Sequence, residues 1–229
     1  MVKLYNNFNI QKKHKNSIIL IGNFDGLHLG HQKLFILAKL YKKKNNLKIG
    51  VVNFNPMPKM FFNKKIKNFR ISNIDQKIKL LTKLEVDFII TKKFDKKFSK
   101  INSIDFIRNI LSKKLKSKFI FVSNNFRFGN KREGDVDLLI KNEKNYNYKV
   151  INPKPLIKSK RTVSSSLIRS YLEKGFLDKA NRLLNRHWSI EGIVIKGRQV
   201  GKKIGFPTCN IDIKNYVLAK PGVYAVKVF

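Results

Sequence analysis

Two histidines three residues apart, His28 and His31, follow a glycine-rich turn in the sequence GNFDGLHLGHQKL. Glycine lets the backbone approach a ligand closely, and asparagine and aspartate tolerate the geometry of tight turns. Such a turn favours an anion, and two imidazoles beside it could donate hydrogen bonds to a phosphate chain. The turn residues that we expect around this anion are Gly22, Asn23, Phe24, Asp25, Gly26 and Gly30.

The residues after the turn predict a helix that begins near Gly30 and His31. The free N–H groups at the start of a helix, with a partial positive charge of about half an electron, would point toward the same anion. A zinc site is one alternative, but the other histidines are His14 and His187, and Cys209 lies far along the chain, so the sequence contains no second ligand pair. A pair of ordinary surface histidines is the other alternative.

Short runs rich in β-branched and aromatic residues alternate with amphipathic stretches along much of the chain. Mostly apolar runs predict parallel strands buried on both faces, and their alternation with helices predicts an α/β fold with a doubly wound sheet. In such a sheet ligands bind beyond the carboxyl ends of the strands, where the histidine turn lies. The expected strands are 17–21, 49–54, 86–90, 118–122 and 148–152, with helical patterns at 34–41, 78–84, 104–111 and 135–144.

The pattern changes after Pro153. Residues 163–184 predict two short helices broken at Gly175, and the first of them opens with serines that can cap it. The rest of the sequence is strand-like and punctuated by glycine. We therefore expect two domains, an α/β domain over residues 1–186 and a small domain of β type over residues 187–229.

The chain has 229 residues, of which 42% are apolar, and a formal net charge of +36. Such a charge suits nucleic acid, but 41 of the cations are lysines spread along the chain and 9 are arginines, whereas base reading favours the arginine fork. We therefore expect a main function other than nucleic-acid binding. The single cysteine excludes an intramolecular disulfide, and the sequence has neither an apolar N-terminal segment nor a run of about 18 apolar residues. These features predict a cytoplasmic protein without a membrane span.

The histidine turn resembles the His-x-Gly-His signature of the nucleotidyltransferase superfamily, in the form found in the bacterial bifunctional riboflavin kinase/FMN adenylyltransferases, the FAD synthetases. The segments VVNFNPMPKMFF, VSNNFRFGNKREGD and VSSSLIRSYLEKGFLDKANRLL resemble further motifs of this family, in the same order. GRQVGKKIGFPTCNI and PGVYAVKV resemble the start of its riboflavin kinase barrel. The resemblance implies a Rossmann-like nucleotidyltransferase domain followed by the start of a small β-barrel.

The resemblance also implies a reaction, the transfer of the adenylyl group of ATP to FMN with Mg²⁺, giving FAD and pyrophosphate. It implies that His28 and His31 hold the ATP phosphates, and that Arg169 with the hydroxyls of Ser164 and Ser165 meets the leaving pyrophosphate. The residues that it implies in flavin binding are Pro56, Pro58, Asn125, Phe126 and Phe128. Spacing alone favours half-buried core positions for the two phenylalanines.

In the kinase segment, the resemblance implies that Thr208 and Asn210 bind Mg²⁺ and ATP phosphates. The family's carboxylate that activates riboflavin lies beyond Phe229, so we expect no riboflavin kinase activity from this chain. A barrel that lacks strands has an unpaired edge, which could pair with another chain and form an oligomer. The chain also departs from the family at Asn55 and Met57, where glutamate and histidine are common.

Two other functions stay open at this point. Another nucleotidyltransferase of the His-x-Gly-His type would use a different acceptor phosphate. A basic RNA-binding protein could keep a nucleotide-binding fold, and it would show strongly salt-dependent binding without an ATP-dependent product.

Overall fold

The computed structural model describes residues 2–198, 203–206, 208–213 and 215–229. Its centre is a sheet whose six strands lie in the order β1-β4-β3-β2-β5-β6. The strands are β1 (Lys3–Tyr5), β2 (Ile18–Ile21), β3 (Ile49–Asn55), β4 (Phe88–Lys93), β5 (Phe119–Phe121) and β6 (Lys149–Ile151). Five of them confirm predicted strands. The edge strand β1 was not predicted, because its residues, KLY, form no apolar run.

The chain runs outward from β2 through β3 and β4, and then crosses back to β5 on the other side of β2. All neighbouring strands are parallel, with Leu20 of β2 in register with Val51 of β3 and Phe121 of β5. The strand order therefore reverses between β2 and β5. In open α/β sheets ligands bind in the crevice outside this switch point. The predicted phosphate turn follows β2, and the predicted flavin segment follows β5.

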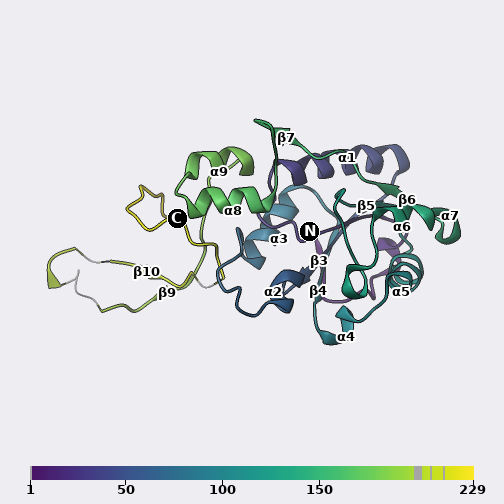
Figure 1. Cartoon of the computed structure of the whole chain (residues 1–229), viewed down its shortest axis with the longest axis horizontal. Coiled ribbons are helices and arrows are strands. Elements are labelled where there is room, and N and C mark those ends of the chain that lie inside the picture. The colour runs from purple at the N-terminus through teal and green to yellow at the C-terminus, as the bar shows by residue number, and fades with distance from the viewer. Residues whose placement is uncertain (1, 199–202, 207, 214) are drawn as a thin grey trace.

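Helices cover both faces of the sheet, which confirms the doubly wound fold (Figure 1). The principal helices on the two faces are α1 (Leu29–Asn45) and α3 (Ile74–Lys83) on one side, and η2 (Phe106–Lys114) and α6 (Val136–Lys141) on the other. Alternate residues of β2 serve the two cores, because side chains of a strand point to opposite faces in turn. Ile18 and Leu20 pack toward α1 and α3, whereas Ile19 and Ile21 pack toward η2 and α6.

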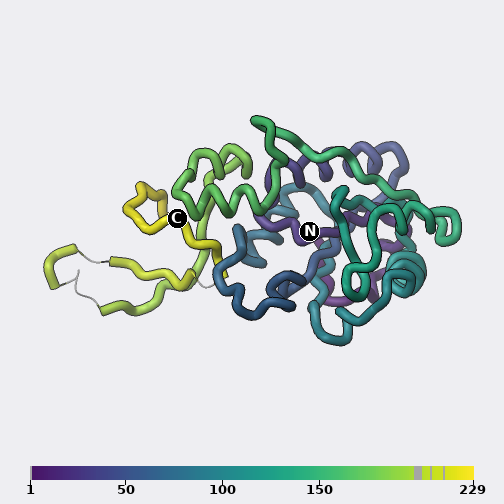
Figure 2. The backbone as a smooth tube through the Cα atoms, viewed as in Figure 1, coloured from purple at the N-terminus to yellow at the C-terminus, as the bar shows by residue number. Residues whose placement is uncertain are grey.

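The predicted helix pair is present as α8 (Ser165–Glu173) and α9 (Leu177–Leu184). The Ser164 hydroxyl accepts a hydrogen bond from the Leu167 amide and caps α8, as predicted. Gly175, with φ of +78°, lies in the break between the two helices. A third core joins this pair to Ile71 and Val217. The C-terminal segment accordingly lies at the α8–α9 end of the molecule (Figure 2).

Beyond residue 187, β9 (Val194–Ile195) and β10 (Asn210–Ile211) form a short antiparallel pair that projects away from the sheet (Figure 1). The remaining short elements are η1 (Lys12–His14), α2 (Pro58–Phe62), α4 (Lys96–Ser99), α5 (Ser103–Asp105), η3 (Asn130–Arg132), α7 (Glu143–Tyr146), β7 (Ile157–Lys158) and β8 (Arg161–Thr162). Within the part of the chain that the structure describes, no helix combines the length and hydropathy needed to cross a bilayer.

Candidate active site

The turn between β2 and α1 places both histidines at the start of α1. Gly26 has φ of +77°, and a Cβ there would lie 2.8 Å from the Ile71 side chain, so both conformation and space require glycine. Phe24 also has a left-handed backbone, with φ of +46°, and its buried ring lies 5.2 Å from the His31 ring between centroids. Backbone strain of this kind concentrates at functional sites.

The rings of His28 and His31 stack, with centroids 3.7 Å apart and planes inclined by 20°. His28 is also the N-cap of α1, because its Nδ1 accepts a long hydrogen bond of 3.4 Å from the His31 amide. A ring nitrogen that accepts a hydrogen bond carries no proton, so the network assigns the His28 proton to Nε2. The Nε2–H group is therefore the donor that His28 can offer to a phosphate.

Both histidines are neutral near pH 7. Burial, followed by the charges of Arg169 and Arg186, lowers the pKa of His28 to about 4. Burial also lowers the pKa of His31, and the nearby His28 and Lys77 act in the same direction. A neutral imidazole still donates through one N–H group. The pair is thus suited to hydrogen bonding, and the positive charge of the site comes from its lysine and arginine neighbours.

We expect stability to fall as the pH drops from about 6.5 to about 4, the range set by His28. The pKa of His28 in the folded protein, about 4, lies below its ordinary value of 6.5, so in this range the unfolded chain binds more protons than the folded one. The free energy of unfolding therefore decreases with falling pH, by up to about 3 kcal/mol from this residue. Urea unfolding across this range measures the loss. His28→Asn, which does not titrate, should lose less, and an equal loss would contradict the assignment.

Asp25 ties the histidine turn to two other parts of the chain. Its carboxylate forms an ion pair with Arg169 Nη2 at 2.9 Å, and accepts hydrogen bonds from the amides of Ile71 at 3.1 Å and Ser72 at 3.3 Å. Its backbone carbonyl accepts a hydrogen bond of 2.8 Å from the Ser165 hydroxyl. Among the described residues, Asp25 is the one acidic residue that is buried. The turn, α8 and the segment before α3 therefore meet at Asp25.

Arg169 is engaged through two of its guanidinium nitrogens. Nη2 pairs with Asp25, and Nε donates a hydrogen bond of 2.8 Å to the Phe69 carbonyl. The guanidinium also lies over the Phe69 ring, with Cζ 3.7 Å from the ring centroid, which is a cation–π geometry. Arg169 therefore holds Asp25 and Phe69 in position. Its third guanidinium nitrogen, Nη1, takes part in neither of these two hydrogen bonds. Its contact with pyrophosphate stays a prediction.

The start of α8 lies against the start of α1. A Cβ at Gly30 would be 3.2 Å from the Val163 carbonyl oxygen and 3.1 Å from the His28 ring, which explains why the turn contains glycine here. Both predicted serine hydroxyls are used within the protein, because Ser164 caps α8 and Ser165 bonds to the turn. The predicted residues that the structure brings together are therefore His28, His31, Asp25, Gly30, Ser164, Ser165 and Arg169.

Several buried polar atoms near this turn have no hydrogen-bond partner in the described structure. They include Asn23 Oδ1 and His31 Nδ1 of the turn itself, Arg70 Nη1 and Lys77 Nζ. Unsatisfied buried groups are uncommon in native proteins and call for an explanation. Atoms of this kind at the switch point of the sheet are what a polar ligand would satisfy.

Lys77 and Arg70 were not predicted as site residues. Lys77 of α3 is only 1% exposed, although lysine is rarely buried without a counter-charge. Arg70 is also buried and donates Nη2 to Asn55 Oδ1 at 2.6 Å. For Lys77 the sequence did contain a signal, because Lys77, Ile78 and Leu81 share one face of a helix on which the other residues are apolar.

Replacing Lys77 with methionine is expected to stabilise the fold and to weaken the activity. Burial lowers the pKa of Lys77 to about 8, although Asp25 acts to raise it, so the amine is still charged at pH 7. A buried charge without a hydrogen-bonded partner is costly, and methionine has a similar length without the charge. The free energy of unfolding at pH 7 should therefore rise by about 1–3 kcal/mol.

The same change should lower kcat/KM for ATP, because the histidine pair loses a neighbouring cation. Urea unfolding and initial rates of the ATP-dependent reaction measure the two effects. Lys83→Met, at an exposed position of the same helix, is the matched control and should change neither. A less stable Lys77→Met protein with unchanged kcat/KM would contradict this interpretation.

The predicted flavin residues lie on the segments that follow β3 and β5. Asn125 is exposed, and its Oδ1 accepts a hydrogen bond of 2.9 Å from the Ser123 hydroxyl. Phe126 stacks on Phe128 at 5.5 Å, and Phe128 is a core residue that packs on Phe106 of η2 at 5.4 Å. Both phenylalanines thus have the core positions that spacing alone favoured, with Phe126 half-buried against the core and Phe128 buried in it, whereas Asn125 remains accessible.

The two prolines lie on the other side of the switch point. Pro58 is the first residue of α2, where its ring suits the start of a helix. Pro56 lines a cavity of about 380 Å³ together with Asn55, Met60, Arg70, Asn73, Ile74, Asn215 and Tyr216. Asn125 does not line this cavity. Pro56 therefore shares a cavity with the polar side chain of Arg70. A flavin site that all five predicted residues form together stays a prediction.

Thr208 and Asn210 lie in the β9–β10 region and are exposed. Among the described residues, no group of three or more His, Cys, Asp or Glu side chains could hold a metal ion, so no such cluster accompanies Thr208 and Asn210. Their role in binding Mg²⁺ and ATP stays a prediction.

Two family models match the chain, that of FAD synthetase over residues 10–167 and that of riboflavin kinase over residues 184–229. The bifunctional riboflavin kinase/FMN adenylyltransferase of Buchnera aphidicola subsp. Schizaphis graminum is 44% identical over 223 residues, which cover 96% of this chain and 71% of the relative. The protein of the same description from Escherichia coli (strain K12) is 34% identical over 218 residues, covering 95% of this chain and 70% of that protein.

A crystal structure described as a macrolide-efflux protein from Streptococcus pneumoniae matches with a TM-score of 0.81 and 26% identity, covering 97% of this chain and 73% of that one. A shared fold does not transfer an activity, so this match supports the architecture alone. The family models and the curated relatives cover the histidine turn, the start of α8 and the segment after residue 184. The chain therefore belongs to the bifunctional riboflavin kinase/FMN adenylyltransferase family.

Proposed function

We propose that this protein transfers the adenylyl group of ATP to FMN and so forms FAD and pyrophosphate. The observation that carries the proposal is the stacked, neutral pair of His28 and His31 at the start of α1, where the strand order reverses. Imidazole donors, a helix N-terminus and the cations Arg169 and Lys77 surround this point, and together they suit a polyphosphate. The relatives are described as FMN adenylyltransferases, which names the acceptor.

In this reaction an oxygen of the FMN phosphate attacks the α-phosphorus of ATP. The bond from that phosphorus to the oxygen that bridges to the β-phosphate breaks, and pyrophosphate leaves with the electron pair. The attacking group is already an anion, so the protein needs no general base. Its task is to align two anions and to stabilise the charge that develops between them.

The residues of the site divide this task. The low pKa of His28 keeps its ring neutral, so the ring takes up no further proton, and its Nε2–H group donates a hydrogen bond to a phosphate oxygen. Asp25 and Arg169 hold the turn, α8 and Phe69 in fixed relative positions. Positive charge from Arg169, Arg186 and Lys77 lowers the cost of bringing two polyanions together.

Mg²⁺ belongs to the predicted reaction, where it would neutralise phosphate charge. Proteins usually hold it through one or two carboxylates together with substrate phosphates. Asp25, the buried carboxylate of the described site, is already committed to Arg169 and two backbone amides. The residues therefore fit Mg²⁺ that arrives bound to ATP better than a metal held by a cage of protein side chains.

The direct test is incubation of the purified protein with ATP, Mg²⁺ and FMN, followed by chromatographic separation of the flavins. We expect ATP-dependent FAD, and its absence would overturn the proposal. A parallel reaction with riboflavin reports on the kinase segment separately. Transfer of the adenylyl group to another phosphate, with FMN left unchanged, would favour a different nucleotidyltransferase. Binding of RNA without any product would favour the RNA-binding alternative.

We also propose the domain division at residues 186 and 187, close to the start of the riboflavin kinase match at residue 184. The cytoplasmic location, the absence of nucleic-acid binding as a function and an oligomer formed through an unpaired barrel edge stay predictions.

A further inference from the structure

Residues 69–73, which we name the bracing segment, support the active site from one side. The Ile71 amide donates a hydrogen bond of 3.1 Å to the Asp25 carboxylate. Arg169, the ion-pair partner of Asp25, donates to the Phe69 carbonyl at 2.8 Å and stacks on the Phe69 ring. The orientation of both charged side chains therefore depends on where the backbone of the bracing segment lies.

The opposite side of the bracing segment is bonded to the part of the chain that matches riboflavin kinase. The Arg70 amide donates to the Asn215 carbonyl at 2.7 Å, and the Val217 amide donates to the Arg70 carbonyl at 2.8 Å. The Trp188 indole donates to the Ile71 carbonyl at 2.9 Å. Trp188, Asn215 and Val217 thus supply partners for backbone groups of the bracing segment, and a buried backbone group without a partner is costly.

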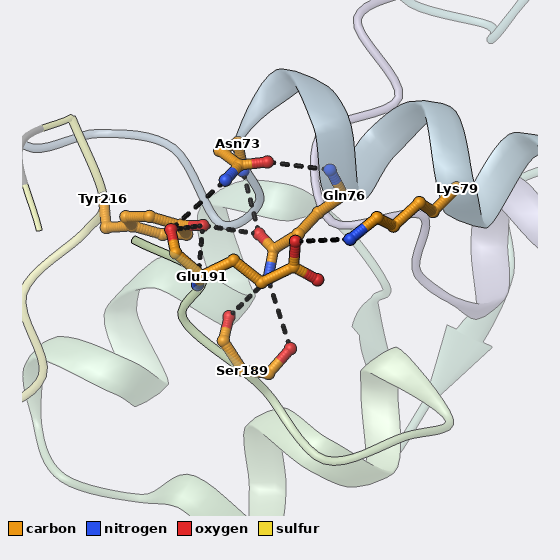
Figure 3. A network of polar contacts seen from close by, with 6 residues as sticks. All are labelled: Asn73, Gln76, Lys79, Ser189, Glu191 and Tyr216. Carbon is orange, nitrogen blue, oxygen red and sulfur yellow. Dashed lines mark hydrogen bonds and ion pairs between the residues drawn. The ribbon is translucent and has the colours of Figure 1, made fainter. Parts of the chain in front are cut away.

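A network of side chains fixes the same contact, as Figure 3 shows. Tyr216 is buried, and its hydroxyl donates to Gln76 Oε1 at 2.7 Å and accepts from the Glu191 amide at 3.1 Å. Gln76 Nε2 donates to the Ser189 carbonyl at 3.0 Å. The same Gln76 forms the capping box of α3 with Asn73, the last residue of the bracing segment. Tyr216 therefore bonds directly to the side chain that sets the start of α3.

We infer that Tyr216 is a positioning residue for adenylyl transfer, through which the riboflavin kinase segment holds the bracing segment and hence Asp25 and Arg169. This inference rests on the proposed function. The hydroxyl of Tyr216 bonds to Gln76 and Glu191, so we infer that it acts through Gln76 and the backbone of residues 69–73. A shift of about 1 Å in groups that align reactants can cost two orders of magnitude in rate, which makes such support important.

Ordinary packing between two segments would also place a buried tyrosine here. The two explanations differ in what Tyr216→Phe changes, since this substitution removes one hydroxyl and keeps the ring. Packing alone predicts a lower melting temperature with unchanged kinetics. Positioning predicts a lower kcat at temperatures where the variant is fully folded, with a smaller change in KM for ATP.

The experiment compares Tyr216→Phe with Tyr224→Phe. Tyr224 lies in the same segment, but its hydroxyl bonds to the Lys220 carbonyl, away from α3. We expect Tyr216→Phe to lower kcat for FAD formation roughly tenfold, and Tyr224→Phe to leave it unchanged. Amide hydrogen exchange of peptides that cover residues 69–77 should become roughly tenfold faster in Tyr216→Phe alone, because local opening becomes easier.

A double variant tests whether the effect passes through Gln76. In a Gln76→Met background the Tyr216 hydroxyl has lost its acceptor on α3, and the Glu191 carbonyl at 3.2 Å is the acceptor that remains. If the effect passes through Gln76, adding Tyr216→Phe should therefore cost little further activity. An undiminished effect of Tyr216→Phe in that background would overturn the inference. So would parental exchange rates over residues 69–77 in Tyr216→Phe. If the parent protein forms no FAD, the proposed function fails, and the exchange experiment still decides whether Tyr216 holds the bracing segment.

Discussion

Replacing His28 with asparagine is expected to lower kcat for FAD formation roughly a hundredfold or more, with a smaller change in KM for ATP. Asparagine is a good N-cap, so the substitution preserves the start of α1. It removes the Nε2–H donor that the structure assigns to His28, together with the stacking on His31. A donor that acts most strongly on charge in the transition state contributes to kcat more than to substrate binding.

Two further variants separate catalysis from folding. His31→Ala should also lower kcat by roughly a hundredfold or more, since His31 completes the stacked pair. His187→Ala removes an exposed histidine outside the site and serves as the control with parental kinetics. Melting curves of all variants identify any general loss of structure. Parental turnover in His28→Asn would remove the imidazole from the mechanism and leave it with a capping role only.

The substitution Asp25→Asn is expected to lower the free energy of unfolding by about 3–5 kcal/mol. Arg169 is only 9% exposed, so losing the carboxylate leaves a buried guanidinium without its counter-charge. For a chain of this length such a loss lowers the melting temperature by on the order of 10 °C. FAD formation should fall as well, because the turn loses the contacts that join it to α8 and Phe69. Urea unfolding and thermal melts measure the stability change.

Glu85→Gln is the matched control, since it breaks an exposed ion pair with Lys39, and it should change the melting temperature very little. The double variant Asp25→Asn with Arg169→Met should be more stable than Asp25→Asn alone, because it also removes the buried guanidinium that Asp25→Asn leaves without its counter-charge. If Asp25→Asn proves no more destabilising than Glu85→Gln, the buried ion pair cannot be what holds these segments together.

Much of the fold could be predicted because its patterns are local. The apolar runs at 49–54 and 86–90 formed β3 and β4, and the serines before residue 167 capped α8 as expected. Capping, turn geometry and side-chain period depend on residues only a few positions apart, so the sequence alone contains them. The strand-like character of the segment after residue 187 was also readable, and β9 and β10 lie there, whereas the edge strand β1 was missed because its three residues, KLY, contain no apolar run.

The histidine turn was also readable from the sequence, since glycine, aspartate and two histidines lie within ten positions between Gly22 and His31. Its resemblance to one enzyme family indicated the reaction, and the family matches confirmed the membership. The tautomer of His28 was not readable. It follows from one hydrogen bond to the His31 amide, which exists only once α1 has formed.

Only the tertiary structure decided which charges are buried and what they meet. Asp25 and Arg169 lie 144 positions apart in sequence, and nothing local marks them as partners. Lys77 is charged in sequence like dozens of other lysines, yet among the lysines that the structure describes it is the one that is buried. Tyr216 reaches Gln76 from 140 positions away. The physical reason is that desolvation depends on every segment that packs around a group. The sequence of this protein determined most of its strands, its histidine turn and its family. The burial of the Asp25–Arg169 ion pair, the burial of Lys77 and the contact between Tyr216 and Gln76 arose only when distant segments together excluded water.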